Sequence, residues 1–325
     1  MVKNYNSQVE QFAGLPVAQL KKTVNTDDTF IKWDDNLFTS ASAGKMIQIN
    51  DASMSQYLYR PFTKKWIWYD RQIIQRARKF DVLFASSNEL LYMTGAGSRK
   101  YSVIATDMMV DKGVMPSGQG FYKNKPSDGL LDLVMTNINK NEAEKIGLDD
   151  EEMYAYVYGV LHSSVYREKY ANDLVKSVPR VPILKYKDQY VRIGRQLLSL
   201  HKAYETQTPL PGVTVKVEGN HTNFHVNKMK HPKRGVLGSI IYNESITISN
   251  IPERAYEYVV GGKPAIEWII DQYQVKTDKK SGITDDPNEF SDDPKYILNL
   301  LLSVITVSMR TLELIDELPE FEVQE

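Results

Sequence analysis

The segment DDEEMYAYVYGVL, residues 149–161, marks the point where the chain changes from strand-like to helical patterning. Asp149 or Asp150 can cap a helix, and the two glutamates that follow suit the positive end of a helix dipole. One apolar stripe then recurs at helical spacing, made by Met153, Tyr156, Val157, Val160 and Leu161. The segment therefore predicts an amphipathic helix that opens a helical block.

The chain after this helix alternates between helices and strands. Further helices are predicted over 166–178, ending at Pro179, and over 188–204. Strand-like runs return within 210–262: GVTVKV (212–217), NFHVN (223–227), GSIIY (238–242) and SITIS (245–249). Alternation in the first and last of these runs predicts one buried and one exposed face. Helix returns over 263–318, with SDDP (291–294) as a start signal.

The chain before residue 149 has a different character. Residues 51–148 are β-rich, with strand-like runs DVLFA (81–85), ELLYMT (89–94) and YSVIAT (101–106) separated by glycine turns. Residues 1–50 are polar and irregular, which indicates a connector or the tail of an upstream domain, so that the main domain spans 51–325. The whole pattern predicts an α+β fold, in which mixed or antiparallel β segments alternate with helical blocks.

Composition sets the broad class. The chain has 325 residues, 42% of them hydrophobic, and a formal net charge of −1, so it can bury a large core and is not a polycation overall. It contains no cysteine, which excludes disulfides, thiolate metal sites and cysteine nucleophiles. No signal peptide is visible, and the longest apolar stretch, 300–307, is too short to span a bilayer. We expect a soluble, cytoplasmic protein without a membrane partner.

Motifs of catalysis are absent from the sequence. There is no phosphate-binding loop, no GxSxG, no HExxH and no EF-hand, and TGAGS (94–98) is typical of a tight turn between two strands. His221 and His225 have the spacing of a helical metal pair but lie in a strand-like run, which favours an exposed polar strand. The acidic residues between 285 and 293 are typical of a solvated capping loop. We therefore expect no catalytic, cofactor or metal site in this chain.

Basic clustering is the feature that stands out. The segment from Arg60 to Phe80 contains seven cationic residues and one acidic residue, Asp70, and the cationic residues are interleaved with aromatic ones. A second patch contains Lys228, Lys230, His231, Lys233 and Arg234. A third, Ser98 to Tyr101, follows the glycine turn, from which its side chains would project. Such patches are typical of DNA contact, because lysine neutralises phosphates and arginine can read guanine. Ordinary solvated faces are the alternative.

Seven segments, in this order along residues 50–318, resemble the C-terminal specificity region of Type ISP restriction–modification enzymes. They are YRPFTKKWIWYD (59–70), TGAGS (94–98), LHSSVYREKYANDL (161–174), VPRVP (178–182), GRQLLSLH (194–201), IPERAYEY (251–258) and KPAIEWIIDQYQVKTD (263–278). The family consists of long single chains that join a nuclease, a helicase-like ATPase, an adenine methyltransferase and a terminal target-recognition domain.

The resemblance implies a DNA target-recognition domain that reads a short sequence in double-stranded DNA. Adenine methylation and cleavage would be carried out by the methyltransferase and the helicase and nuclease domains of the parent enzyme. Those domains would use S-adenosylmethionine, ATP and Mg²⁺, and this chain would hold none of these cofactors. The signature of the family's methyltransferase, Asn-Pro-Pro-Tyr or Asp-Pro-Pro-Tyr, is absent, because no Pro-Pro pair occurs in the sequence. The chain is thus expected to be no enzyme by itself, but a fragment, a split gene product or a remnant. Residues 1–50 would then be the tail of the methyltransferase domain.

Two groups of site residues follow from the patches. The expected base readers are Ser98, Arg99, Lys100 and Tyr101 at a hairpin tip, with Lys228, Lys230, Lys233 and Arg234 in the second β region. The expected phosphate clamps are Lys64, Lys65 and Arg71, and more weakly Lys276, Lys279 and Lys280. The aromatic residues of the shared segments are expected to be scaffold: Tyr59, Pro61, Phe62, Trp66 and Tyr69 in a core or domain junction, and Tyr154, Tyr156 and Trp268 in helix seams.

Two other functions compete with DNA recognition. In the first, the helices at 150–205 and 263–318 are docking surfaces for the other parts of a large enzyme, and DNA contact is minor. In the second, the chain is an enzyme in its own right, which the lack of a nucleophile, metal set or cofactor loop disfavours.

Overall fold

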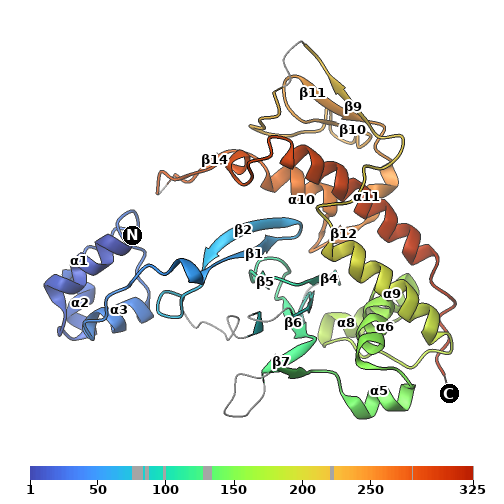
Figure 1. The fold of residues 1–325 in the computed structure, drawn as a ribbon, viewed down its shortest axis with the longest axis horizontal. Coiled ribbons are helices and arrows are strands. Elements are labelled where there is room, and N and C mark those ends of the chain that lie inside the picture. The colour runs from blue at the N-terminus through green and yellow to red at the C-terminus, as the bar shows by residue number, and fades with distance from the viewer. Residues whose placement is uncertain are drawn as a thin grey trace. The chain divides into compact units, whose positions relative to one another are not determined.

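The fold is described from a computed structural model (Figure 1). The structure describes residues 1–74, 83–84, 88–97, 100–126, 134–219, 223–279 and 281–324. The chain forms two compact units. The smaller unit comprises Met1–Gln56, Trp66–Asp81 and Lys276–Asp285, and the larger unit comprises Tyr57–Lys65, Val82–Val275 and Asp286–Glu325. Helices and small sheets alternate along the chain, which confirms the predicted α+β class.

The smaller unit begins with three helices, α1 (Val2–Phe12), α2 (Val17–Thr23) and α3 (Asp35–Ser42). Asp34 caps α3 by accepting a hydrogen bond from the Leu37 amide at 2.8 Å. Tyr5, Val9, Leu20 and Ile31 lie in a small core of their own. The prediction that residues 1–50 are irregular was therefore wrong. The unit also contains the short turn η1 (Asp51–Ser53) and the antiparallel pair β14 (Lys276–Thr277) and β15 (Thr284–Asp285).

Strands β1 (Met54–Arg60) and β2 (Thr63–Trp68) each begin in one unit and end in the other, and β1 pairs in parallel with β5 (Met109–Val110). Phe62, in the turn between β1 and β2, has a φ of +59° and a fully buried side chain. Its ring packs edge-on against Tyr204, with centroids 5.4 Å apart. Burial of this ring offsets the cost of the left-handed backbone. Trp66, in contrast, is 61% exposed and lies in no core, so of its two predicted places only the domain junction stays a prediction.

In the larger unit, β3 (Leu90–Met93) is the central strand of an antiparallel sheet between β4 (Val103–Thr106) and β6 (Gln119–Tyr122). The predicted strands at 89–94 and 101–106 are thus confirmed, and TGAGS lies in the connection between them. The predicted strand at 81–85 falls mostly outside the described residues. A second antiparallel pair follows, β7 (Asn124–Pro126) with β8 (Val134–Thr136).

The helical block contains α5 (Lys140–Ile146), α6 (Asp150–His162), α7 (Ser164–Lys169), α8 (Ala171–Lys176) and α9 (Lys187–Lys202). Asp149 caps α6 as predicted, because its carboxylate accepts from the Glu152 amide at 2.8 Å and Glu152 reaches back to the Asp149 amide. The single helix predicted over 166–178 is instead two helices. Tyr170, with φ −107° and ψ 20°, separates them.

Two glycines let α6 and α9 approach closely. A Cβ atom placed on Gly194 of α9 would lie 1.9 Å from the Ala155 carbonyl oxygen of α6. One placed on Gly159 of α6 would lie 2.5 Å from the Tyr190 carbonyl oxygen of α9. Both contacts are with backbone atoms, which cannot rotate away. The distance between the two helix axes therefore depends on glycine at both positions.

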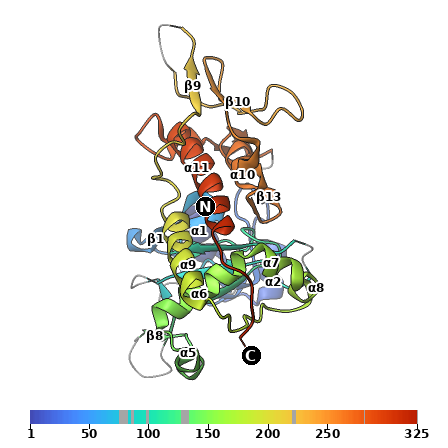
Figure 2. The ribbon, with the colours of Figure 1, turned by 90° about the vertical axis from the view of Figure 1, so that its right-hand side faces the viewer.

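The C-terminal half contains a small sheet, a short helix and a long helix. The sheet has the order β10-β11-β9, from β9 (Thr214–Val217), β10 (Ser239–Ile241) and β11 (Ile246–Ser249). It is followed by η2 (Glu253–Glu257), the pair β12 (Val259–Val260) and β13 (Lys263–Pro264), α10 (Ala265–Gln272), η3 (Pro287–Glu289) and α11 (Tyr296–Asp316). Figures 1 and 2 show the sheet beyond one end of α10 and α11. Residues 223–227 form no strand, contrary to the prediction.

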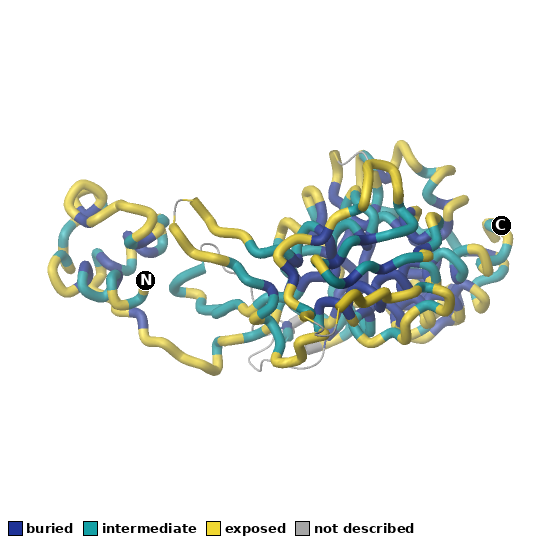
Figure 3. The backbone as a smooth tube through the Cα atoms, turned by 90° about the horizontal axis from the view of Figure 1, so that it is seen from above, coloured by how far each residue is buried: buried dark blue, intermediate teal, exposed yellow. Residues whose placement is uncertain are grey.

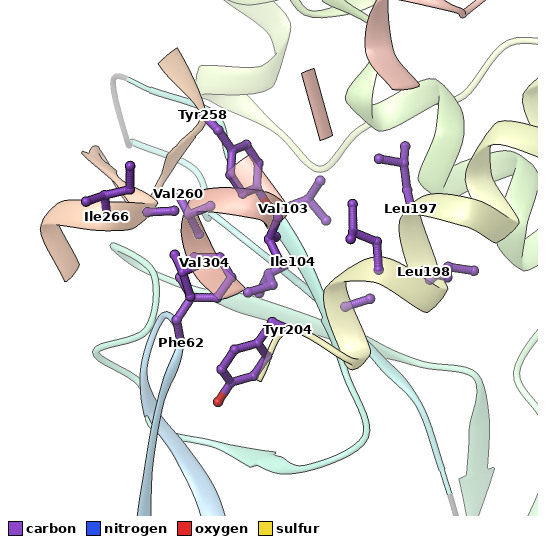
Figure 4. Packing of buried hydrophobic residues seen from close by; sticks show 14 of the residues in the cluster. Phe62, Val103, Ile104, Leu197, Leu198, Tyr204, Tyr258, Val260, Ile266 and Val304 are labelled. Carbon is purple, nitrogen blue, oxygen red and sulfur yellow. The ribbon is translucent and has the colours of Figure 1, made fainter. Parts of the chain in front are cut away.

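Helix α11 is the central element of the larger unit's core. It is long and apolar enough to cross a membrane by length and composition, but most of that stretch is buried inside the fold. Figure 3 shows this unit's buried interior, and Figure 4 shows Val304 of α11 among Phe62, Tyr258 and Val260. Tyr154 and Tyr156 are buried and Trp268 is half-buried, which agrees with the prediction that they line helix seams.

A chain of hydrogen bonds crosses this core from β4 to α11. The Tyr158 hydroxyl accepts from the Ala105 amide at 3.0 Å and lies 2.5 Å from His201 Nδ1. His201 Nε2 lies 2.8 Å from the Thr311 hydroxyl, which itself donates to the Val307 carbonyl at 2.7 Å. These partners assign the His201 proton to Nε2, because Nδ1 must accept from Tyr158. Every side chain of this relay (Tyr158, His201 and Thr311) is at most 1% exposed.

We expect Gly194→Ala to destabilise the protein. In an open helix this change would stabilise by about 1 kcal/mol through helix propensity. Here the overlap with the Ala155 carbonyl reverses the sign, and we expect a net loss of about 2 kcal/mol or more. Urea denaturation followed by circular dichroism measures the difference. Ser199→Ala, at an exposed position of the same helix, is the control and should be neutral. A stabilised Gly194→Ala protein would contradict the close packing of α6 and α9.

We expect the free energy of unfolding to fall between pH 6.5 and pH 5. Burial and the nearby Arg167 lower the pKa of His201 to about 3, and burial lowers the pKa of His162 well below its ordinary value. The unfolded chain therefore binds protons in this range and the folded chain does not, so stability is full above pH 6.5 and lost as the pH falls. The loss at pH 5 is about 2 kcal/mol for each histidine.

Urea denaturation at each pH measures this loss, and the NMR signals of the two rings should show no titration above pH 5. Ser199→Ala, which removes no titratable group, is the control and should keep the same pH dependence. Two rings that titrate near pH 6.5 would contradict the neutral relay.

Candidate functional site

The second basic patch forms an exposed loop, residues 228–236, which we call the basic loop. Its backbone is fixed at three points. Met229 is buried, with 1% exposure, and Lys230 exchanges two backbone hydrogen bonds with Ile241 of β10, at 2.8 and 3.1 Å. His231 is held by Ser239 and by Glu267 of α10, with ring nitrogens 3.0 and 2.8 Å from the acceptor oxygens. The loop is thus a rigid extension of the β10-β11-β9 sheet.

The four predicted cations of this loop all face solvent. Within the part of the chain that the structure describes, none of them lies within ion-pair distance of a carboxylate. They are Lys228, Lys230, Lys233 and Arg234. An anionic partner would meet a positive field that no neighbouring side chain neutralises.

Strand β9 lies at the edge of the adjoining sheet and is exposed on both faces. Val215 and Val217 are 37% and 42% exposed, and Thr214 and Lys216 on the other face are also exposed. The prediction of one buried face holds for β11 but was wrong for β9. Sequence alternation did not reveal this, because it predicts two faces without saying whether another layer covers either. Among the described residues β9 pairs with β11, so it forms the outer strand of the three-stranded sheet.

The hairpin between β3 and β4 carries the other predicted readers. Ser98 and Arg99 lie outside the described residues, and Lys100 is exposed. Tyr101 is half-buried, its hydroxyl lies 3.7 Å from the Met93 sulfur, and burial raises the pKa of this phenol. Lys100 is therefore available to a partner, whereas Tyr101 packs inward rather than projecting from the tip.

The predicted phosphate clamps have different surroundings. Lys64 is only 23% exposed and forms a 2.6 Å ion pair with Glu205, so its charge is already neutralised. Lys65 lies over the rings of Tyr59 and Phe290, at 4.7 and 5.6 Å from their centroids. Arg71 is exposed. In the β14–β15 hairpin Lys276 and Lys279 are exposed, and Lys280 lies outside the described residues.

Among the described residues, no three histidine, cysteine or acidic side chains gather as a metal ion would require. His225 is exposed, and its Nε2 lies 3.9 Å from the Asp286 carboxylate, while His221 falls outside the described range. In the acidic loop, Asp285 is the last residue of β15, and Asp286 caps η3 by accepting a hydrogen bond from the Asn288 amide at 2.9 Å.

The fold is that of the specificity part of restriction–modification enzymes. The structure of a nuclease-deletion mutant of the Type ISP enzyme LlaGI, in complex with a DNA substrate mimic, is similar over 100% of this chain and 26% of that chain, with 48% identity and a TM-score of 0.91. The ATP-dependent Type ISP enzyme LlaBIII, bound to DNA, is similar over 99% of this chain and 22% of that chain, with 45% identity and a TM-score of 0.89.

Residues 1–300 match the family model described as the Type ISP C-terminal specificity domain. The chain therefore belongs to this family, which confirms the resemblance found in the sequence. A DrdV–DNA complex shares the fold, with 23% identity, a TM-score of 0.84 and coverage of 98% of this chain and 33% of that chain. No curated protein matches the chain. The chain spans about a quarter of the length of LlaGI and LlaBIII.

Proposed function

We propose that this chain is the module of a Type ISP-like restriction–modification enzyme that recognises a specific sequence in double-stranded DNA. The observation that carries the proposal is the likeness of the entire chain to parts of two enzymes whose structures contain DNA or a DNA mimic. Other domains of the parent enzyme would methylate adenine and cleave, with S-adenosylmethionine, ATP and Mg²⁺ as their cofactors. Residues 1–50 would connect to the methyltransferase domain, and 51–325 would recognise DNA in the cytoplasm.

The basic loop supports this function through its uncompensated charge. Four exposed cations on a backbone fixed by Met229, Lys230 and His231 offer phosphate contacts without a large cost of ordering the loop. Lys100 would add a contact from the β3–β4 hairpin. The predicted clamp Lys64 would contribute less, since binding a phosphate would require it to leave Glu205. Lys65 and Arg71 stay predictions, as do Ser98, Arg99 and Tyr101.

The edge strand β9 is suited to sequence reading. The major groove of DNA admits β-structure, and β9, the outer strand of the three-stranded sheet, is exposed on both faces where it would enter. Val215 and Val217 lie on one face, where their methyl groups would contact thymine methyls. The adjoining basic loop would hold the phosphates that flank the groove. Affinity and specificity would thus come from neighbouring parts of one sheet.

A docking function is the second candidate, and one observation favours it. An apolar cavity of about 180 Å³ lies between the β3–β6 pair and α6, lined by Phe121, Tyr154 and Val181 among others. Phe121 is 41% exposed, and the buried Tyr154 hydroxyl has no hydrogen-bond partner. A neighbouring domain of a longer enzyme could cover this cavity. Retention of duplex binding by the isolated chain separates the two functions, because docking alone predicts none.

We expect the double variant Lys228→Gln/Lys233→Gln to lose affinity for duplex DNA of any sequence. Each phosphate contact that is lost reduces the slope of log affinity against log salt by about 0.9, so the slope should fall by almost 2. Fluorescence anisotropy at several salt concentrations measures it. Lys140→Gln/Lys176→Gln, at two exposed lysines on helices, is the matched control and should keep the slope. Equal slopes for the two double variants would count against DNA contact by the basic loop.

We expect Val215→Thr/Val217→Thr to weaken sequence preference while sparing general affinity. Threonine keeps the shape and the strand preference of valine but replaces a methyl by a hydroxyl that no longer suits a thymine methyl. After the preferred duplex is found by selection from a random pool, the ratio of specific to non-specific affinity should fall about tenfold. Ile283→Thr, at another exposed aliphatic residue, is the control. An unchanged ratio would exclude β9 as the reader.

A further inference from the structure

A second cavity of the larger unit lies away from the basic loop and β9. It has a volume of about 480 Å³ and is lined by residues of the β3–β4 hairpin, α6 to α8, the η2 region and α11. The lining side chains that matter here are Lys100, Tyr101, His162, Arg167, Glu257 and Tyr258. The sequence predicts DNA reading for Lys100 and Tyr101 and no binding role for the other four.

Arg167 brings a positive charge into this cavity without a counterion. Its Nε donates to the Leu161 carbonyl at 2.6 Å, and the guanidinium carbon lies 5.6 Å from the centre of the Tyr101 ring. In the described part of the chain no carboxylate approaches it within ion-pair distance. Burial lowers the pKa of Arg167, which still leaves it cationic at neutral pH. A desolvated cation of this kind is stabilised by an anion, and the protein supplies none.

His162 presents an unsatisfied acceptor in the same cavity wall. Its Nδ1 lies 2.9 Å from the Tyr158 carbonyl oxygen, which can only accept, so Nδ1 carries the proton. Nε2 is therefore a lone-pair acceptor, and it is buried, in a residue that is 1% exposed, with no hydrogen-bond partner among the described residues. Such a nitrogen is satisfied by a donor group, and none of the side chains that the structure describes provides one.

The rest of the lining sets the limits for a ligand. Tyr101 and Tyr258 contribute aromatic walls, and the exposed Lys100 and Glu257 place one charge of each sign at the mouth. The Tyr258 hydroxyl lies 3.3 Å from His201 Nε2 and so has a partner inside the core. Two groups thus remain for a ligand to satisfy: the Arg167 guanidinium, which needs an anion, and His162 Nε2, which needs a donor.

We propose that this cavity binds the hydrogen phosphate ion, with its charged oxygens on Arg167 and its P–OH donating to His162 Nε2. Phosphate fits because it keeps a P–OH group at neutral pH while it carries negative charge. Carboxylate, sulfate and the phosphodiesters of DNA are anions without a donor. Lys100 at the mouth is the one residue that this site shares with the proposed contacts to the DNA backbone.

The decisive experiment compares phosphate with sulfate, which has nearly the same shape but no hydroxyl. Isothermal titration calorimetry on the full chain at pH 7 should show phosphate binding about tenfold more tightly than sulfate, the ratio expected for one hydrogen bond to a buried acceptor. Equal binding of the two ions, or no binding of either, overturns the proposal. Duplex binding through the basic loop is measured separately by gel shift without phosphate, so failure here leaves the proposed function standing.

Two variants at the cavity mouth test the location without touching the core. Lys100→Gln should weaken phosphate binding several-fold and Glu257→Gln should strengthen it, because the two remove opposite charges. Lys140→Gln, far along the chain on α5, should change nothing. Arg167→Met should abolish binding, with its thermal unfolding measured beside it. Shifts of the same sign for Lys100→Gln and Glu257→Gln would place the ion elsewhere and overturn the assignment, even where Arg167→Met fails to fold.

The cavity is larger than a phosphate ion, so the phosphate group could belong to a larger molecule. A further experiment identifies which molecule carries it. Adenosine monophosphate should bind more tightly as the pH falls through about 6, where its phosphate gains a P–OH. A 5′-phosphorylated oligonucleotide should then outcompete its 5′-hydroxyl counterpart only if DNA ends, rather than free phosphate, occupy the cavity. Tighter binding of the monophosphate at high pH would contradict the donor role assigned to the P–OH.

Discussion

The hydrogen-bond relay through Tyr158, His201 and Thr311 is the constraint on which the larger unit depends. It joins β4, α6, α9 and α11, elements that lie up to two hundred residues apart in the sequence. Each buried polar atom in it has one geometry that satisfies it, so the relay specifies the register of these elements more sharply than apolar packing alone. Gly159 and Gly194 complete the constraint, since they let α6 and α9 come close enough for Tyr158 and His201 to meet.

The same core positions the proposed DNA surface. Glu267, which holds His231 of the basic loop, lies on α10, and Ile266 and Ile269 of the same helix are buried in the core with α11. The loop cations therefore stand on an element fixed by the core, although they are themselves exposed. A recognition module needs this combination. The side chains that read a nucleobase must be held by a rigid scaffold, and they must also face outward. The core that contains the relay thus also holds the basic loop in place, through α10.

How much the sequence could predict depended on how local the signal is. The cap at Asp149 and the strands at 89–94 and 101–106 are local signals and were found. The three N-terminal helices were missed because they are short and polar, so that packing around Tyr5 and Leu20 stabilises them rather than propensity. The exposure of β9 and the pairing of Lys64 with Glu205, 141 residues away, depend on tertiary structure and leave no trace in a local pattern. Residue types at the candidate site were predictable, but their partners were not.

Charge pairing separates two roles that composition alone confuses. The chain is nearly neutral, and cations such as Arg60, Lys64 and Lys202 have acids of this chain as partners, at 2.6 to 2.9 Å. These pairs stabilise the fold and leave little field outside it. Among the described residues, the four exposed cations of the basic loop have no such partner, and no carboxylate lies within ion-pair distance of Arg167, so in both places an anion from another molecule would be stabilised. The exposed loop suits a long polyanion such as duplex DNA, whereas the cavity beside Arg167 suits a single phosphate group. The cations without an acidic partner thus divide, by their degree of burial, between two proposed binding sites of different size.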